Sequence, residues 1–448
     1  MSYSPALSYF LDRLQGYSTN VFRLEAQGSN SASASKIIRF TLPSNALLNL
    51  RSFALHFNAT TAGTTAGARL PAKIDTLVDR VEVTAGGVQL SAGANFYNVL
   101  RHAKDALMGD SCCPVLGHPE IVRAESYVDS SAIATTGNET YASTNNSAQF
   151  AIQKWEGFLG TCEPKILDSS LVPDLVVSIY LSDNSVLTSS AGVGLDGAGT
   201  TDITDDGAGG ASYSLANIHA TIECLGLAGS TYNNMVAGMI ASQGFLELPF
   251  KQYFSFQDTV TNTMRFTVAT QSLDRIWVAH RQDAFGTQAA PVRVSGYVKH
   301  DATTTTGVAE FEGLEYNKEK YVGPFYNFAE PPTTSKILYQ FQLNGAYYPQ
   351  FKATFEEMYN ISGNSVLGKP GHKHSLQTMK DNYSVQCIRL NMPESEFSRL
   401  VSGLDTRAVS LNGYYVMDNV SQGRTVNLFA ECTSSLKIGA GRMIETVQ

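Results

Sequence analysis

The residues from Gly363 to Lys369 come nearest to an enzymatic motif in this sequence. Gly363-Asn-Ser-Val-Leu-Gly-Lys follows the glycine-rich pattern that cradles phosphate groups as far as Lys369. The next residue is Pro370, where the pattern requires a Ser or Thr to bind the metal ion. Proline also disfavours helical backbone at the residue before it, and the segment follows a predicted helix instead of a strand. We therefore expect no phosphate site here.

Two further segments carry residue types that can bind metal ions. His372 and His374 could chelate a metal only with an extended residue between them and a third ligand from elsewhere in the fold. The Asp- and Gly-rich stretch from Asp196 to Asp206 lacks the alternating Asp spacing and the final Glu of a calcium loop. We expect a solvated loop at the histidines and no metal ion at either place.

Other catalytic signatures are absent from the sequence. It contains no Gly-x-Ser-x-Gly elbow, no His-Glu-x-x-His helix, and no Gly-x-Gly-x-x-Gly between a predicted strand and a helix. Paired catalytic carboxylates cannot be identified from spacing along β strands. The sequence therefore predicts no catalytic, cofactor-binding or metal-binding residue, and no enzymatic activity.

Composition restricts the class of protein further. The 448 residues suggest about three ordinary domains or two large β domains. Charged residues make up 16% and hydrophobic residues 43%, so the chain can bury a large core. The net charge of −8 argues against a protein whose main task is to neutralise nucleic-acid phosphates. We expect no specific nucleic-acid binding.

The sequence also bears on location and on cysteine chemistry. The stretch from Met1 to Leu14 lacks the pattern of a signal peptide, and no window approaches the roughly 18 apolar residues of a membrane span. These observations predict a soluble, unsecreted chain, in which sequons such as those at Asn58 and Asn360 carry no weight. Six cysteines without a CxxC pair predict free and mostly buried thiols: Cys112, Cys113, Cys162, Cys224, Cys387 and Cys432.

Alternation of apolar and polar residues with a period of two predicts that the chain is mostly β strand. In the segment 36–42 one face carries Ile38, Phe40 and Leu42, while Arg39 and Thr41 take the other. The same pattern recurs at Phe53, Leu55 and Phe57, at Val81 and Val83 against Arg80 and Glu82, and at Tyr339, Phe341 and Leu343 against Gln340 and Gln342.

Predicted helices are few and scattered. They cover residues 5–14, 96–107, 231–241, 351–359 and 394–401. This number is too small for alternating strand–helix units, so a parallel α/β sheet is disfavoured.

Three matches within the sequence indicate that one β domain is duplicated. Ile38-Arg-Phe-Thr-Leu matches Met264-Arg-Phe-Thr-Val at an offset of 226 residues. A strand, a glycine turn and a helix recur with Gly87 over Gly345, and Ile222-Glu-Cys-Leu matches Ala430-Glu-Cys-Thr. Because the three pairs occur in the same order, we predict two similar domains with insertions of different length.

Long turn-rich segments interrupt the predicted strands. They cover 110–147, 183–212 and 283–334, the last of which is the predicted insertion of the second half. Loops of this length in a compact domain are usually functional surfaces or disordered segments.

A duplicated β domain with a strand–turn–helix insertion in each half resembles the double jelly-roll major capsid proteins of icosahedral double-stranded DNA viruses. The text that carries the resemblance starts at Phe40, Leu70 and Gln271: Phe40-Thr-Leu-Pro-Ser-Asn, Leu70-Pro-Ala-Lys-Ile-Asp-Thr-Leu-Val-Asp-Arg-Val-Glu-Val, and Gln271-Ser-Leu-Asp-Arg-Ile-Trp-Val-Ala-His-Arg. It looks most like the capsid proteins of polinton-like and virophage-like viruses of algae and protists, and it covers nearly the whole chain from about Gly16.

The resemblance implies an all-β fold of two tandem eight-stranded jelly rolls with short inserted helices and long loops. It divides the chain into a helical arm at 1–18, a first jelly roll at 19–230, a linker helix at 231–245 and a second jelly roll at 246–448. It further implies a homotrimer that forms a pseudo-hexagonal capsomer in the virion, with penton and minor or cement capsid proteins as partners. The three long segments would supply tower and inter-subunit loops.

The arm and the function leave alternatives open. The segment Pro5–Leu14 could pack on its own subunit or trimer neighbour, or it could touch an internal membrane or a minor capsid protein. A carbohydrate-binding or adhesin-like β-sandwich would share the aromatic residues Tyr347, Tyr348, Tyr414 and Tyr415 in loops. A glycan-active β-sandwich enzyme would need a cleft with two carboxylates about 5 to 9.5 Å apart.

Overall fold

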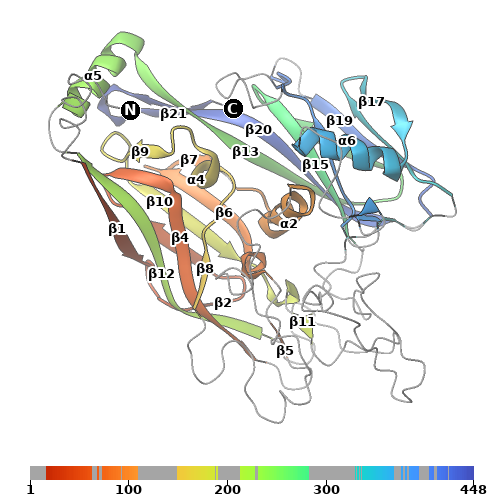
Figure 1. The fold of residues 1–448 in the computed structure, drawn as a ribbon, viewed down its shortest axis with the longest axis horizontal. Coiled ribbons are helices and arrows are strands. Elements are labelled where there is room, and N and C mark those ends of the chain that lie inside the picture. The colour runs from red at the N-terminus through yellow and green to blue at the C-terminus, as the bar shows by residue number, and fades with distance from the viewer. Residues whose placement is uncertain are drawn as a thin grey trace, which may run out of the picture.

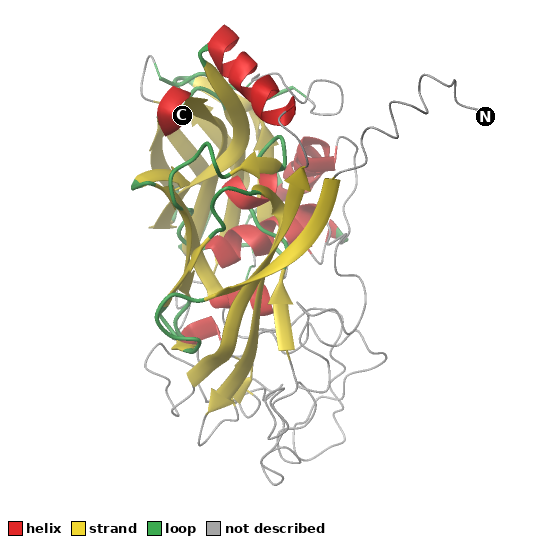
Figure 2. Ribbon diagram, turned by 90° about the vertical axis from the view of Figure 1, so that its left-hand side faces the viewer, coloured by secondary structure: helices red, strands yellow, loops and turns green. Residues whose placement is uncertain are grey.

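The computed structural model describes most of both halves of the chain. The described residues are 17–62, 68–69, 73–91, 93–108, 149–186, 188–189, 212–227, 231–281, 328, 330–331, 333, 335–367, 375–376, 379–380, 383–392, 403–407, 411–421 and 423–447. Antiparallel strands dominate them, in two groups that lie side by side (Figure 1). Seen from the side, the long strands run along the length of the molecule (Figure 2).

The first half contains two principal sheets and short accessory strands. One sheet has the order β1-β12-β4-β8 and the other the order β3-β10-β6-β7. The strands are β1 (Tyr17–Glu25), β2 (Ala32–Ser33), β3 (Ile37–Thr41), β4 (Leu47–Ala62), β5 (Ala68–Arg69), β6 (Val78–Ala85), β7 (Val88–Ser91), β8 (Gln149–Ile152), β9 (Ile166–Asp168), β10 (Leu175–Leu181), β11 (Thr188–Ser189) and β12 (Ser212–Leu227). The helices are η1 (Ile74–Leu77), α2 (Tyr97–Met108), α4 (Phe158–Thr161) and η3 (Asn184–Val186).

The second half repeats the two principal sheets strand for strand. Its sheets have the orders β13-β20-β15-β18 and β14-β19-β16-β17. Its elements are β13 (Phe245–Val260), β14 (Thr263–Val268), β15 (Leu273–Arg281), β16 (Leu338–Leu343), β17 (Ala346–Ala353), α6 (Phe355–Leu367), β18 (Val385–Arg389), β19 (Leu411–Asp418), β20 (Arg424–Gly439), η6 (Ala440–Arg442) and β21 (Ile444–Val447). Two four-stranded antiparallel sheets in this order form a jelly roll, so the predicted all-β fold of two eight-stranded jelly rolls is confirmed.

The three sequence matches fall on equivalent strands. Ile38 and Met264 lie on β3 and β14, which take the same place in their sheets. Glu223 and Glu431 lie on β12 and β20. The matched glycines form the turns of the hairpins β6–β7 and β16–β17, where both central residues have positive φ: Gly86 at 53°, Gly87 at 85°, Asn344 at 47° and Gly345 at 87°. Such turns match the twist of a hairpin and require residues that tolerate positive φ.

Both halves start from the same end of the molecule. The first residue of β1, Tyr17, pairs with Leu227 at the end of β12, and α5 (Thr231–Gln243) then leads into β13. In the second half Phe245 pairs with Gly439, close to the C-terminal strand β21. The helix α5 therefore connects two sandwiches that stand in the same sense (Figure 1).

The period-two pattern predicts the core well. Phe40, Phe53, Val83 and Phe341 all have at most 1% of their surface exposed, and a single cluster of buried apolar side chains runs through both halves. Gln340, predicted on the polar face, is an exception because it is buried and donates from Nε2 to the carbonyl oxygen of Pro349 at 3.1 Å.

The helix predictions are partly confirmed. The helices α2 and α5 cover the predicted ranges 96–107 and 231–241 to within two residues at each end. The predicted helix at 351–359 is wrong at its start, because 351–353 extend strand β17. Thr354 and Glu357 then form a capping box, in which the Thr354 backbone N donates to Glu357 Oε2 at 2.8 Å. The predicted helices at 5–14 and 394–401 lie outside the described residues.

The predicted long loops are described only near their ends. The segment 110–147 lies outside the described residues, and so does most of 183–212 and 283–334. Val186 and Phe328, which belong to the last two, are buried, with 2% and 0% exposure. These ends are therefore part of the packed structure instead of exposed loop.

Four of the six cysteines are described, and all four are free and buried: Cys162, Cys224, Cys387 and Cys432. Burial raises the pKa of the Cys162 thiol to about 12 and also raises the pKa of the other three. No helix within the described ranges is long and apolar enough to span a membrane.

Candidate functional site

Helix α2 lies between the two sandwiches (Figure 1). It contacts β6 of its own half, and β15, β18 and α6 of the other half. Ten of its twelve residues are buried, including Arg101, Lys104 and Asp105. Because burying an unpaired charge is costly, these side chains require partners within the interface.

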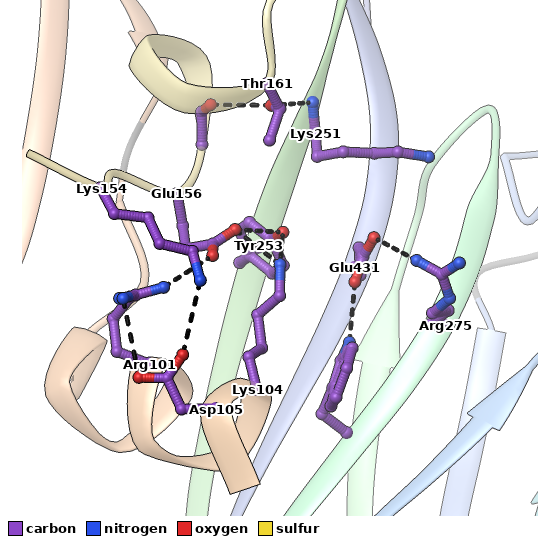
Figure 3. Close-up of polar contacts among 12 residues, drawn as sticks. Arg101, Lys104, Asp105, Lys154, Glu156, Thr161, Lys251, Tyr253, Arg275 and Glu431 are labelled. Atoms are coloured by element: carbon purple, nitrogen blue, oxygen red, sulfur yellow. Dashed lines mark hydrogen bonds and ion pairs between the residues drawn. The ribbon is translucent and has the colours of Figure 1, made fainter. Parts of the chain in front are cut away.

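Glu156, which follows β8, supplies the central partner (Figure 3). Its carboxylate accepts from Lys104 Nζ at 2.6 Å and from Arg101 Nη1 at 3.2 Å. Arg101 also lies 3.4 Å from Asp75 and 3.7 Å from Asp105, so its guanidinium is surrounded by carboxylates.

The environment keeps these groups charged. Burial favours the neutral form of Glu156, but Lys104 and Arg101 outweigh burial and lower its pKa to about 2. Burial likewise opposes the charge on Arg101, and Asp105 and Asp75 reverse the effect and raise its pKa. A carboxylate that stays ionised at all ordinary pH values cannot act as a general acid, so this cluster is suited to holding elements together.

The second sandwich completes the cluster through β13 and β15. Tyr253 Oη accepts from Lys104 Nζ at 2.9 Å and donates to Glu156 Oε2 at 3.1 Å. The ammonium group of Lys104 also lies 5.8 Å from the ring centre of Trp277, whose Nε1 donates to Glu431 at 2.7 Å. A cation over an aromatic face in a buried site contributes a favourable electrostatic interaction.

Contacts on both sides of this cluster extend the interface. Phe158 of α4 packs edge-on against Phe250 of β13, with ring centres 5.2 Å apart. The Lys251 backbone N donates to Thr161 Oγ1 at 2.8 Å (Figure 3). At the start of α2 the Asn95 backbone N donates to Ser255 Oγ at 3.0 Å. The interface thus fixes the second sandwich against the first along β13.

The residues singled out in the sequence analysis do not meet in a site. Gly363 to Leu367 form the last turns of α6 instead of a phosphate-binding loop. Lys369, Pro370, His372, His374 and the segment 196–206 lie outside the described residues.

The tyrosines considered for carbohydrate binding lie on strands, so their placement in loops is wrong. Tyr347 and Tyr348 belong to β17, and Tyr414 and Tyr415 belong to β19. Tyr415 is fully buried, where it bonds to His280 Nε2 at 2.7 Å and donates to Gln386 at 3.0 Å. It cannot stack against a ligand.

One pocket of about 270 Å³ carries two carboxylates, Glu330 and Glu356. Glu330 accepts from Tyr339 Oη at 2.9 Å and pairs with Lys380 at 3.0 Å, while Glu356 pairs with Lys336 at 3.7 Å. Hydrogen bonding within the first turn of α6 lowers the pKa of Glu356. A glycosidase needs one carboxyl group with a raised pKa, which Glu356 does not supply. Glu330 is engaged by Tyr339 and Lys380, so the pocket does not support the glycan-active alternative.

Sequence reasoning missed the interface cluster, although two signals were present. The predicted helix at 96–107 carries Arg101, Lys104 and Asp105 close together, beside its apolar stripe. The repeated Glu-Cys pair marks Glu431, which the second half buries at 2% exposure. Neither signal identifies Glu156 or Tyr253 as partners, because those contacts join segments far apart in the chain.

Comparisons with known proteins identify the architecture. No protein-family model and no curated protein matches the chain. The capsid protein in the quasi-atomic model of the PBCV-1 virus capsid is similar, with 10% identity, a TM-score of 0.55 and 97% coverage of both chains. PBCV-1 VP54, fitted into a reconstruction of the virophage Sputnik, gives 12% identity, a TM-score of 0.54 and 97% coverage of both chains.

The Faustovirus major capsid protein is similar as well, with 10% identity and a TM-score of 0.53 over 95% of this chain and 91% of that one. The likeness therefore extends over essentially the full length of each protein. At this level of sequence identity it establishes the fold, and the chain has the double jelly-roll fold of these viral major capsid proteins.

Proposed function

We propose that this protein is the structural major capsid protein of an icosahedral double-stranded DNA virus. The observation that carries the proposal is the repeated jelly roll. Two sandwiches with the same strand order are held in one chain by a buried interface, and the chain shares its fold with viral capsid proteins over essentially their full length. Of the similar solved structures named above, two are described as a virus capsid or a major capsid protein, and the third as VP54 fitted into a reconstruction of the virophage Sputnik.

The proposed unit of assembly is a homotrimer. Each chain contains two jelly rolls of similar shape, at 19–230 and 246–448, linked through 231–245. Three chains then contain six such jelly rolls, and the resulting pseudo-hexagonal capsomers can tile a nearly flat shell. The low share of charged residues suits a protein whose surface is largely covered by its neighbours.

The proposed partners follow from a place in the virion. They are other copies of the same chain, neighbouring capsomers, penton proteins and minor or cement proteins. The arm at 1–18 is the proposed contact to an internal membrane or to a minor capsid protein, and the long segments at 110–147, 183–212 and 283–334 are the proposed tower and inter-subunit loops. The role is structural and requires neither catalysis nor a cofactor.

Mass photometry of the purified full-length chain tests the proposal. A chain of 48.4 kDa should give a particle of three chain masses that persists on dilution. A carbohydrate-binding protein or an enzyme with this fold has no need to form three-fold particles. A monomer at every concentration would contradict the capsid assignment.

A further inference from the structure

The two halves of the chain share their strand order but differ in which surfaces are covered. In the second half, β20 buries twelve of its sixteen residues, on both faces, and the other four are half-buried. In its counterpart β12, buried side chains alternate with half-exposed and exposed ones. The outer face of the sheet β13-β20-β15 is covered by α2 and the segment around Glu156. Among the described residues, no helix or segment covers the matching face of β1-β12-β4 in this way.

Strand register gives the equivalent residues. Glu223 and Glu431 are matched by the repeat, Val21 pairs with Glu223, and Tyr253 pairs with Glu431. Val21 therefore occupies the place of Tyr253. Tyr253 is 5% exposed beneath the first sandwich, whereas Val21 is 64% exposed.

The neighbouring residue on β1 shows the same difference. Phe22 takes the place of Phe254, which packs partly buried against the core, and yet Phe22 is 44% exposed. Because successive residues of a strand point to opposite faces, Val21 lies on the outer face of β1 and Phe22 on the other. An edge strand with an exposed apolar side chain on each face is unusual unless a partner covers it. We name β1 with these two side chains the open strand.

The complementary surface lies on the second sandwich. Three elements of the first half carry the central contacts to the second sandwich: the connection from β7 to α2, helix α2 itself, and the segment after β8. Their counterparts are the connection from β17 to α6, helix α6, and the segment after β18. Helix α6 leaves Glu357, Asn360 and Asn364 exposed, while α2 is buried on nearly every side.

Each of two counterparts, β17 and the segment after β18, carries exposed apolar residues. Tyr347 and Phe351 on β17 are 43% and 52% exposed, and Met392 after β18 is 60% exposed. We name these three residues with α6 the open helix surface. Of the eleven large apolar side chains exposed among the described residues, five lie on the open strand or on the open helix surface: Val21, Phe22, Tyr347, Phe351 and Met392.

We propose that the open helix surface of one copy covers the open strand of the next copy, repeating between chains the contact that α2 and Glu156 make within a chain. The occupant of the open strand is thus a second copy of this chain. The inference rests on the proposed function, since it names the contact that would join the copies of a trimer. A contact in which one surface of each copy binds a different surface of the next closes into a ring when the rotation between copies is constant. Around this ring, contacts between jelly rolls of one chain would alternate with contacts between jelly rolls of neighbouring chains.

Charge complementarity supports this pairing. Arg23 occupies the place of Ser255, which accepts from the backbone N of Asn95 just before α2. By repetition Arg23 would lie against the start of α6, where Glu356 and Glu357 occupy the first turn. In the single chain Arg23 pairs with the exposed Glu25 at 2.7 Å, and a second set of carboxylates opposite its guanidinium would help to fix the register of the two surfaces.

Cross-linking tests the predicted pairing directly. The variants Arg23→Cys and Phe351→Cys are made separately and together in the full-length chain and treated with a flexible bismaleimide. The double variant should give covalent dimers and trimers on a denaturing gel, whereas each single variant should remain uncross-linked, as the wild-type control does. Cross-linking of Arg23→Cys alone would indicate a back-to-back contact and would overturn the proposal.

A disruptive variant provides an independent measurement. Val21→Glu should raise the concentration needed for the trimer at least tenfold in mass photometry. Ile37→Glu is the matched control, because Ile37 is a 45% exposed residue on another strand of the same sandwich, and it should leave the trimer unchanged. If the wild type is a trimer, but Val21→Glu leaves that trimer unchanged and the double cysteine variant does not cross-link, this contact is overturned and the proposed function stands. A wild-type monomer would overturn the proposed function itself.

Discussion

Replacing Glu156 with Gln tests whether the buried ion cluster holds the two sandwiches together. The substitution keeps the shape of the side chain but removes the negative charge that faces Lys104 at 2.6 Å and Arg101 at 3.2 Å. The folded protein lowers the pKa of Glu156 from 4.5 to about 2. At about 1.4 kcal/mol per pH unit, this shift corresponds to about 3 kcal/mol of stability at neutral pH.

The sign of the pH dependence follows from the lowered pKa. The stabilisation is fully present above pH 4.5, the value for the unfolded chain, and it is lost as the pH falls toward 2. The difference between wild type and Glu156→Gln should therefore stay near 3 kcal/mol from pH 7 to pH 5 and fall to about 1 kcal/mol at pH 3.

Urea unfolding at a fixed protein concentration measures this difference. Glu163→Gln serves as the control, because Glu163 forms an exposed ion pair with Arg51 and should change the free energy of unfolding by less than about 1 kcal/mol. A loss of less than about 1 kcal/mol for Glu156→Gln, or a difference that does not change between pH 5 and pH 3, would refute the electrostatic reasoning.

Three further predictions concern buried residues. Burial lowers the pKa of His280 to about 3, so on acidification the unfolded chain binds a proton at this residue before the folded chain does. Lowering the pH from 6.5 to 5 should therefore reduce the free energy of unfolding by about 2 kcal/mol, and a pH slope in His280→Gln equal to that of the wild type would contradict this. Gly413→Ala would place a Cβ 2.3 Å from the ring of Phe266 and should destabilise by about 1–3 kcal/mol in urea unfolding, whereas unchanged stability would contradict the packing. Cys162 and Cys387, buried with raised pKa values, should react with a thiol reagent only after denaturation, as mass spectrometry of labelled peptides can show.

The sequence predicts the fold well because jelly-roll strands depend on local patterns. Period-two alternation identified the buried faces of β3, β4, β6 and β16. The glycine at position 345 indicated a turn, and in the structure it has the positive φ that such a hairpin turn requires. The repeat identified equivalent strands because duplicated domains keep the spacing of their core residues.

The interface between the halves could not be predicted in the same way. The contact between Lys104 and Tyr253 joins residues 149 positions apart, and nothing in either local pattern indicates that they meet. The start of the helix predicted at 351 was misplaced for a related reason, since Phe351 is apolar and fits a helical stripe, but pairing with β16 extends β17 to Ala353. Tertiary pairing overrides local periodicity in such places.

The most direct test of the central claim is electron microscopy of the purified full-length protein. The account predicts class averages with three-fold symmetry and six lobes of similar size, since each chain would contribute two jelly rolls to a closed ring. Particles of a single two-lobed chain, or oligomers in which the lobes do not alternate around a three-fold axis, would contradict the proposal that this protein builds a capsid.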